Sequence, residues 1–148
     1  MTDRSFEGLN DDTRRRLAGL VASLDGAALA TDTGEGWSVA TVLAHLAYWD
    51  RHVMACWRGV GDRLTPEEWP DTMAETVNDA IEPFLAAIPG PVSAALVLEA
   101  AAEIDALVAG LSDMAVDTVR AEGQGWMLDA WDHRVEHITQ IERGLGRA

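Results

Sequence analysis

The chain has 148 residues, of which 25 are acidic and 11 are basic, and its formal net charge is −14. This length is typical of one domain, and we expect a single domain over residues 1–148. The hydrophobic fraction of 48% supports a packed core and excludes a disordered chain. The excess of acids disfavours nucleic acid and anionic membranes as partners, because both are bound through Lys and Arg side chains.

The numbers of cysteine and lysine residues exclude several kinds of site. The chain contains a single cysteine, Cys56, which excludes a disulfide within the chain, and it contains no Lys. Without Lys, neither Schiff-base chemistry nor a P-loop is available. The first ten residues, MTDRSFEGLN, lack the basic and apolar regions of a signal peptide. We therefore expect a cytoplasmic protein.

Apolar residues recur at helical spacing along nearly the whole chain, and no segment is predicted as a strand. A first helix is expected from about Asn10 into the twenties. The second helix has a clear start, because Ser38 is a candidate N-cap and Trp37 and Val42 are placed to form a hydrophobic staple. This helix is expected to end near Gly59.

The remainder of the chain predicts two further long helices. Glycine and proline mark the connections between them, and the prolines at 89 and 91 give the clearest break. The expected elements are a loop over 61–72, a weaker helix over 73–88 that Pro83 limits, a long helix over 92–111, a connecting region over 113–124 and a last long helix over 125–144. Four long amphipathic helices predict an all-α fold, a four-helix bundle.

Three of the four histidines are candidates for one metal site. His133 and His137 are separated by four residues, so their side chains point about 40° apart and lie about 6 Å apart along a helix. His45 borders the apolar face of the second helix. Three imidazoles from two helices would leave a coordination position for water or substrate, as in catalytic metal sites. The alternative is that each is an isolated, hydrogen-bonded residue at the edge of the core.

The remaining histidine and the cysteine do not fit this site. His52 lies about 10.5 Å beyond His45 along the helix, too far to bind the same ion, so a pocket wall or the surface is expected. Cys56 has no second cysteine nearby and is interpreted as a small buried apolar residue. Trp49, His52 and Trp126 are predicted to line a substrate pocket.

Two segments resemble the DinB-like superfamily, which includes YfiT-like metalloenzymes and the N-terminal domain of mycothiol-dependent maleylpyruvate isomerase. GWSVATVLAHLAYWDRHV resembles its second-helix signature, and WDHRVEHITQIERGL resembles its last-helix signature. The resemblance implies a bundle with up-down-down-up topology and one divalent metal. His45, His133 and His137 match its ligand positions. The isomerase branch has a carboxylate at one last-helix position, so the chain is more similar to three-histidine members.

The resemblance also implies a function. It favours a metal-dependent transferase or isomerase that uses a low-molecular-weight thiol, of the mycothiol or bacillithiol type, together with a small-molecule substrate. Imidazole ligands favour Zn²⁺ or Ni²⁺ over Mg²⁺ or Ca²⁺. Two alternatives stay open: a hydrolase that activates water at the metal and removes a toxic metabolite, and a non-catalytic metal-binding or stress-response protein. Six Trp residues in a small bundle are also compatible with a homodimer.

Overall fold

The computed structural model describes residues 1–61 and 63–147. Within these residues the fold is all-helical, as the sequence predicts, and the only β-pairing is an isolated antiparallel bridge between Asp32 and Ser38. None of the described helices combines the length and the apolar character needed to cross a membrane.

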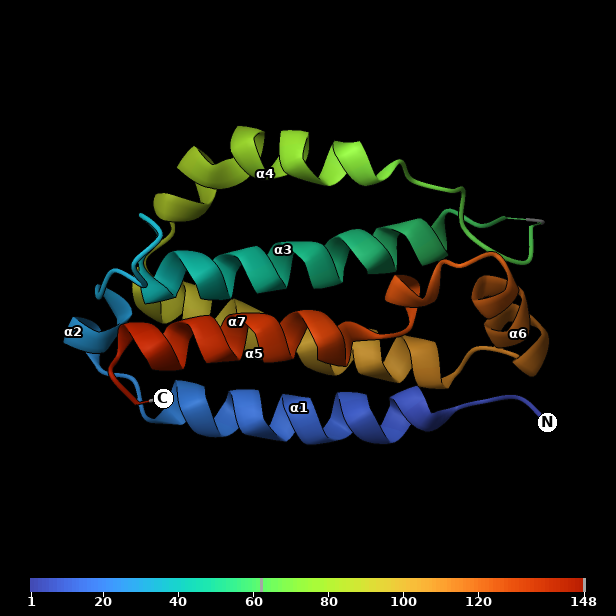
Figure 1. Cartoon of the computed structure of the whole chain (residues 1–148), viewed down its shortest axis with the longest axis horizontal. Helices are drawn as coiled ribbons and strands as arrows, with labels where there is room; N and C mark the ends of the chain where they lie inside the picture. Colours follow the sequence, from blue (N-terminus) through green and yellow to red (C-terminus); the bar gives the residue numbers. More distant parts are fainter. Residues whose placement is uncertain (62, 148) are drawn as a thin grey trace.

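Four long helices form the bundle (Figure 1). In Figure 1, the first and last of them run in one direction along the bundle and the middle two run in the other, which gives the up-down-down-up topology. The first packs beside the last, and the two middle helices pack beside each other. The four are α1 (Ser5–Ala22), α3 (Val39–Arg58), α5 (Gly90–Ala109) and α7 (Ala130–Gly144).

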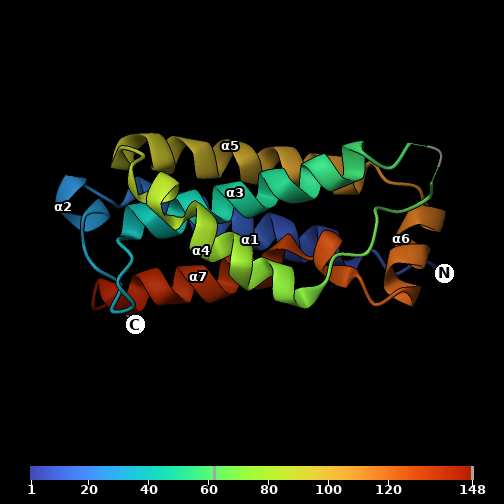
Figure 2. The same cartoon turned by 90° about the horizontal axis from the view of Figure 1, so that it is seen from above.

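A fifth helix, α4 (Asp71–Ala86), connects the two parallel helices α3 and α5. Because α3 and α5 run in the same direction, the chain must return along the length of the bundle between them. Helix α4 makes this return on the outside of α3, and Figure 2 shows it crossing obliquely over that helix. Pro83 lies inside α4 without ending it.

The start of the bundle differs from the prediction in two places. Helix α1 begins at Ser5 and not near Asn10, because the Asp3 carboxylate accepts a hydrogen bond from the Ser5 amide at 2.9 Å and Phe6 is fully buried. A single turn, α2 (Gly26–Leu29), was not predicted. The start of α3 agrees with the prediction, since the Ser38 hydroxyl accepts a hydrogen bond from the Thr41 amide.

The prediction for residues 113–144 was wrong in two respects. The expected connecting region contains a helix, α6 (Asp113–Ala121), and the expected last helix is divided into η1 (Gly125–Met127) and α7. The division coincides with an ion pair between Arg120 and Asp129 at 2.8 Å. A Cβ atom at Gly125 would lie 2.6 Å from Nη1 of Arg120 and 3.0 Å from Oδ2 of Asp129, so this ion pair packs directly against the backbone where η1 begins.

The core has two apolar clusters separated by a polar layer. One cluster includes Leu43 and Ile138, and the other, nearer α6 and η1, includes Met54 and Met127. Each long helix contributes one polar residue near the boundary between the two clusters. The four are Asn10 on α1, Asp50 on α3, Asp105 on α5 and Arg134 on α7.

Candidate metal centre

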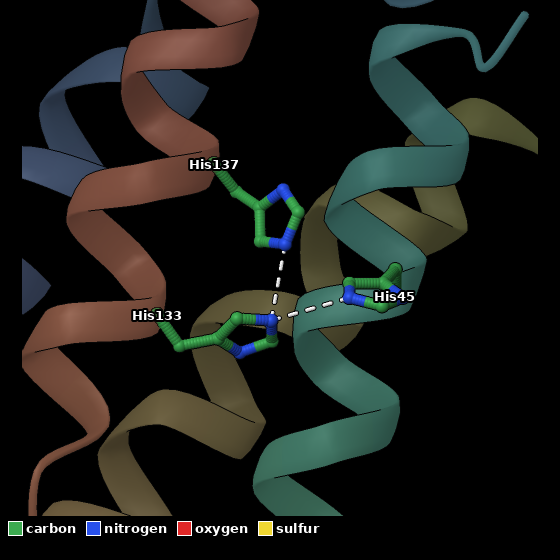
Figure 3. A group of neighbouring side chains, drawn as sticks. All are labelled: His45, His133 and His137. Carbon is green, nitrogen blue, oxygen red and sulfur yellow. Dashed lines mark hydrogen bonds between the residues drawn. The ribbon is translucent and has the colours of Figure 1, made fainter. Parts of the chain in front are cut away.

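Three imidazole rings meet between α3 and α7 (Figure 3). His45 extends from α3, and His133 and His137 extend from successive turns of α7. The Nε2 atom of His133 lies 3.2 Å from Nε2 of His45 and 3.0 Å from Nε2 of His137. The structure therefore brings together the three histidines that the sequence singled out.

The spacing of these nitrogens fits a single metal ion. Ligands held at about 2.0–2.1 Å from one ion, the usual Zn–N distance, lie about 2.8–3.0 Å apart at adjacent octahedral positions and about 3.3–3.4 Å apart in tetrahedral geometry. The two Nε2 separations of 3.0 and 3.2 Å lie between these limits, and the ligand atoms of all three residues lie within 4.8 Å of one another. Without an ion, the three Nε2 atoms would face one another although each neutral imidazole has only one N–H group to donate.

Burial keeps two of the rings in the form that binds metals. Burial, together with the neighbouring His137, lowers the pKa of His45 to about 3. Burial also holds the pKa of His133 well below its usual value, with His137, His45 and Arg134 acting in the same direction. Both rings are therefore neutral at pH 7, and neutral imidazole is the metal-binding form.

Gln140 sets the orientation of the third ring. Its side-chain amide donates to the Glu35 carboxylate at 3.1 Å and to the Thr33 hydroxyl at 3.2 Å. A carboxylate only accepts, so the NH₂ group must face Glu35, and the amide oxygen then accepts from Nδ1 of His137 at 2.7 Å. Nδ1 of His137 consequently carries the proton, and the Nε2 lone pair is free to bind an ion.

Arg134 fixes the rotation of α7 about its axis. Its side chain is fully buried, and its guanidinium donates to Asp105 at 2.8 and 3.0 Å and to the backbone oxygen of Asn10 at 3.1 Å. Because Arg134 points into the bundle, the adjacent His133 is turned toward α3. Arg134 was missed from the sequence, since a charged residue on a helix gives no signal of burial.

A cavity of about 500 Å³ opens beside the histidines. His45 and His133 line it, together with side chains from α3, α4, η1 and α7. Trp49, Trp69 and Trp126 also line it. Of these, Trp69 was not anticipated, because the loop prediction over residues 61–72 gave no position for its side chain.

His52, the third residue expected at a pocket wall, is not among the residues that line the cavity. Its ring packs against Trp69 at a centroid distance of 4.3 Å and lies 3.5 Å from Sγ of Cys56. His52 therefore packs against Trp69, which lines the cavity, without lining the cavity itself. Burial raises the pKa of the half-buried Cys56 thiol, which disfavours the reactive thiolate.

Comparison with known proteins gives one match. A family model described as the DinB superfamily matches residues 9–141, which is most of the chain and includes all three histidines. No curated protein and no solved structure matches the chain.

Proposed function

Because the chain belongs to the DinB superfamily, we propose that it is a metal-dependent enzyme whose His45, His133 and His137 bind one Zn²⁺ or Ni²⁺ ion. One observation carries the proposal: three Nε2 atoms converge beside an open cavity. Three protein ligands leave room at the ion for a small molecule, which is typical of catalytic metal sites and not of closed structural ones.

The proposed reaction is group transfer or isomerisation with a low-molecular-weight thiol as cosubstrate. A divalent ion, when bound, supplies the Lewis acidity that lowers the pKa of a coordinated thiol. The chain holds the ligands in place through Gln140 and Arg134 and surrounds the cavity with indole side chains. The cavity volume of about 500 Å³ lies within the usual range for small-molecule sites.

The charge of the cavity favours one of the two thiol types. Asp132 and Glu136 line it, and none of its described lining residues is Lys or Arg. Bacillithiol carries two carboxylates on its malate group and one protonated amine, so its net charge is −1, whereas mycothiol is an uncharged sugar derivative. Like charges repel in a partly desolvated site, so we favour a thiol of the mycothiol type.

Hydrolysis is the second candidate, and the same carboxylates favour it. Asp132 and Glu136 share the cavity with His133, where either can accept a proton from an attacking water molecule. A hydrolase of this kind would need the metal but no thiol.

The metal site is tested by elemental mass spectrometry of the tag-free protein after loading with Zn²⁺ or Ni²⁺. We expect about one ion per chain, and loss of that ion in His45→Ala and His137→Ala. His52→Ala is the matched control, since His52 lies on the same helix as His45 but outside the cluster, and it should retain the ion. A wild-type chain that stays metal-free after loading with Zn²⁺, Ni²⁺, Fe²⁺ and Mn²⁺ would exclude the metalloenzyme.

The reaction class is tested by turnover of a panel of electrophiles with and without mycothiol or bacillithiol. Thiol-dependent product formation that chelation abolishes supports the transferase or isomerase. Chelator-sensitive turnover without thiol instead supports the hydrolase. Tight metal binding without turnover in either assay would point to the non-catalytic alternative.

A further inference from the structure

The cavity beside the histidines has several carboxylates in its lining, and most of them have no paired cation among the described residues. Asp71, Asp132 and Glu136 line it and are exposed to solvent. Among the described residues none of these three has an ion-pair partner, whereas Asp129 in the same lining is paired with Arg120. Since none of the described lining residues is Lys or Arg, the potential in the cavity is negative.

A fifth carboxylate lies deeper in the cavity and has a free acceptor. Asp50 is 5% exposed, and its Oδ2 atom accepts no hydrogen bond from any described residue. Arg134 approaches this oxygen only to 3.5 Å, because its guanidinium is directed to Asp105. A buried carboxylate oxygen without a donor is costly. A donor that enters from the cavity would remove this cost.

Three indole rings accompany the carboxylates. Trp49 and Trp69 pack edge to face at a centroid distance of 5.7 Å, and Trp126 is 40% exposed. The Trp49 ring nitrogen donates to Asn78 of α4 at 2.9 Å, which fixes the ring against that helix. Indole faces attract cations more strongly than other aromatic rings do. Carboxylates alone could balance the charge of a metal ion, but the indoles have no such role.

We propose that this cavity binds a substrate with a positively charged nitrogen, such as an amine, a guanidinium or a quaternary ammonium group, attached to an apolar body. The carboxylates pair with the charge, and the indoles contact both the cation and the apolar part. This inference deepens the proposed function, because it treats the cavity beside the metal ligands as the substrate site. It also predicts that anionic substrates of similar size are rejected.

Three probes that share a phenyl ring and a two-carbon chain test the charge preference. They are 2-phenylethylamine, 2-phenylethanol and phenylacetate, with charges of +1, 0 and −1 at pH 7. We expect isothermal titration calorimetry with the full-length, metal-free protein to give a Kd for the amine at least tenfold below that for the alcohol, with phenylacetate weakest. Raising the salt concentration should reduce the difference. Equal affinity for amine and alcohol, or tighter binding of phenylacetate, would overturn the proposal.

Single substitutions locate the binding determinants. Asp132→Asn and Glu136→Gln should each raise the Kd of the amine severalfold and leave the Kd of the alcohol unchanged, because they remove a charge without changing side-chain size. Trp69→Leu should raise the Kd of the amine by a larger factor than the Kd of the alcohol. Asp12→Asn is the control for total charge, since Asp12 is exposed on α1 and does not line the cavity. A loss in Asp12→Asn equal to that in Asp132→Asn would show a general charge effect and contradict the assignment.

The metal-free titration also separates this inference from the metal site. If His45→Ala loses Zn²⁺ but the metal-free chain still prefers the amine, both assignments stand. If wild type binds no metal and the amine preference persists, only the metalloenzyme fails. If the metal-free chain shows no preference and the Zn²⁺-loaded chain prefers phenylacetate, the metal sets the charge selectivity and the cation site is wrong.

Discussion

At the scale of single residues, Gln140 determines how well the third histidine binds an ion. It accepts a hydrogen bond from Nδ1 of His137, and Glu35 and Thr33 hold it in that orientation. Gln140→Leu removes the acceptor, and we expect it to weaken Zn²⁺ binding by about 10- to 100-fold. Competition with a chromophoric chelator measures the affinity.

Gln140→Glu is the matched comparison for this prediction, because a carboxylate also accepts from Nδ1 of His137. It also loses the donation to Glu35 and is repelled by that carboxylate, so its affinity should lie between those of wild type and the leucine variant. Equal affinities in wild type and both variants would show that Gln140 does not orient the ring.

Asp50 makes the stability of the metal-free protein depend on pH. Burial raises its pKa from 3.8 to about 6, and Arg134 only partly opposes this shift. The folded chain therefore binds more protons at this site than the unfolded chain between about pH 4 and 6. The contribution of Asp50 to the free energy of unfolding accordingly falls as the pH rises through this range.

Asp50→Asn removes this dependence, since the amide does not titrate. The stability of Asp50→Asn relative to wild type should rise by the order of 2 kcal/mol between pH 4 and pH 7. Urea unfolding of both metal-free proteins at several pH values measures the difference. If the stability difference between the two proteins does not change with pH, the raised pKa of Asp50 is wrong.

The residue scale also shows what the sequence could predict of the site. His133 and His137 are four residues apart on one helix, and that spacing alone places them together. His45 was assigned to the same site because it lies at the edge of an apolar helix face and because of the family resemblance. The buried ion-pair cluster beside the site was not predictable, because Asp50, Asp105 and Arg134 come from three helices and meet only after the bundle has packed.

At the scale of elements, Gly144 permits a close approach between α7 and the loop that supports Gln140. A Cβ atom at this position would lie 2.8 Å from Cα of Thr33 and 3.3 Å from the backbone oxygen of Asp32. Gly144→Ala must therefore displace the loop, and we expect a loss of about 1–3 kcal/mol in stability. Urea unfolding tests this.

Gly19→Ala provides the opposite expectation within the same fold. Gly19 lies inside α1 with open space around its missing Cβ, so alanine should stabilise the chain by about 0.5–1 kcal/mol. If Gly144→Ala stabilises the chain as Gly19→Ala is expected to do, the close contact at Gly144 is wrong; if Gly19→Ala destabilises it, the open space at Gly19 is wrong.

Helix prediction was accurate at the start of α3 and inaccurate between residues 113 and 130. Ser38 and the apolar positions after it predicted α3. Ser112 is an equivalent cap before Ala115, Val116 and Val119, so the signal for α6 was present but was not recognised. The break before α7 also had a local signal, because two glycines precede it and Asp129, a residue type favoured at N-caps, stands directly before Ala130.

At the scale of the whole molecule, the metal site connects α3 to α7. An ion that binds only the folded chain stabilises it by about 2.7 kcal/mol when its free concentration is 100 times Kd. For a chain of 148 residues we expect Zn²⁺ at that excess to raise Tm by about 5 to 10 °C. Differential scanning calorimetry measures the shift.

The variants His45→Ala and His52→Ala test whether the rise in Tm comes from an ion at this site. His52→Ala should show the full rise in Tm, whereas His45→Ala should show none. A rise of equal size in His45→Ala would place the bound ion elsewhere, for example among the exposed acids.

The distance between the ligands along the chain has a consequence for how the protein acquires its ion. His133 follows His45 by 88 residues. A ribosome that adds about 5–20 residues per second needs roughly 4 to 18 seconds to make the intervening segment. A nascent chain that has exposed only α3 presents one histidine of the three, so the proposed site does not yet exist at that stage of synthesis. An ion bound there would therefore be selected only once α7 docks, from the ions that are available at that moment.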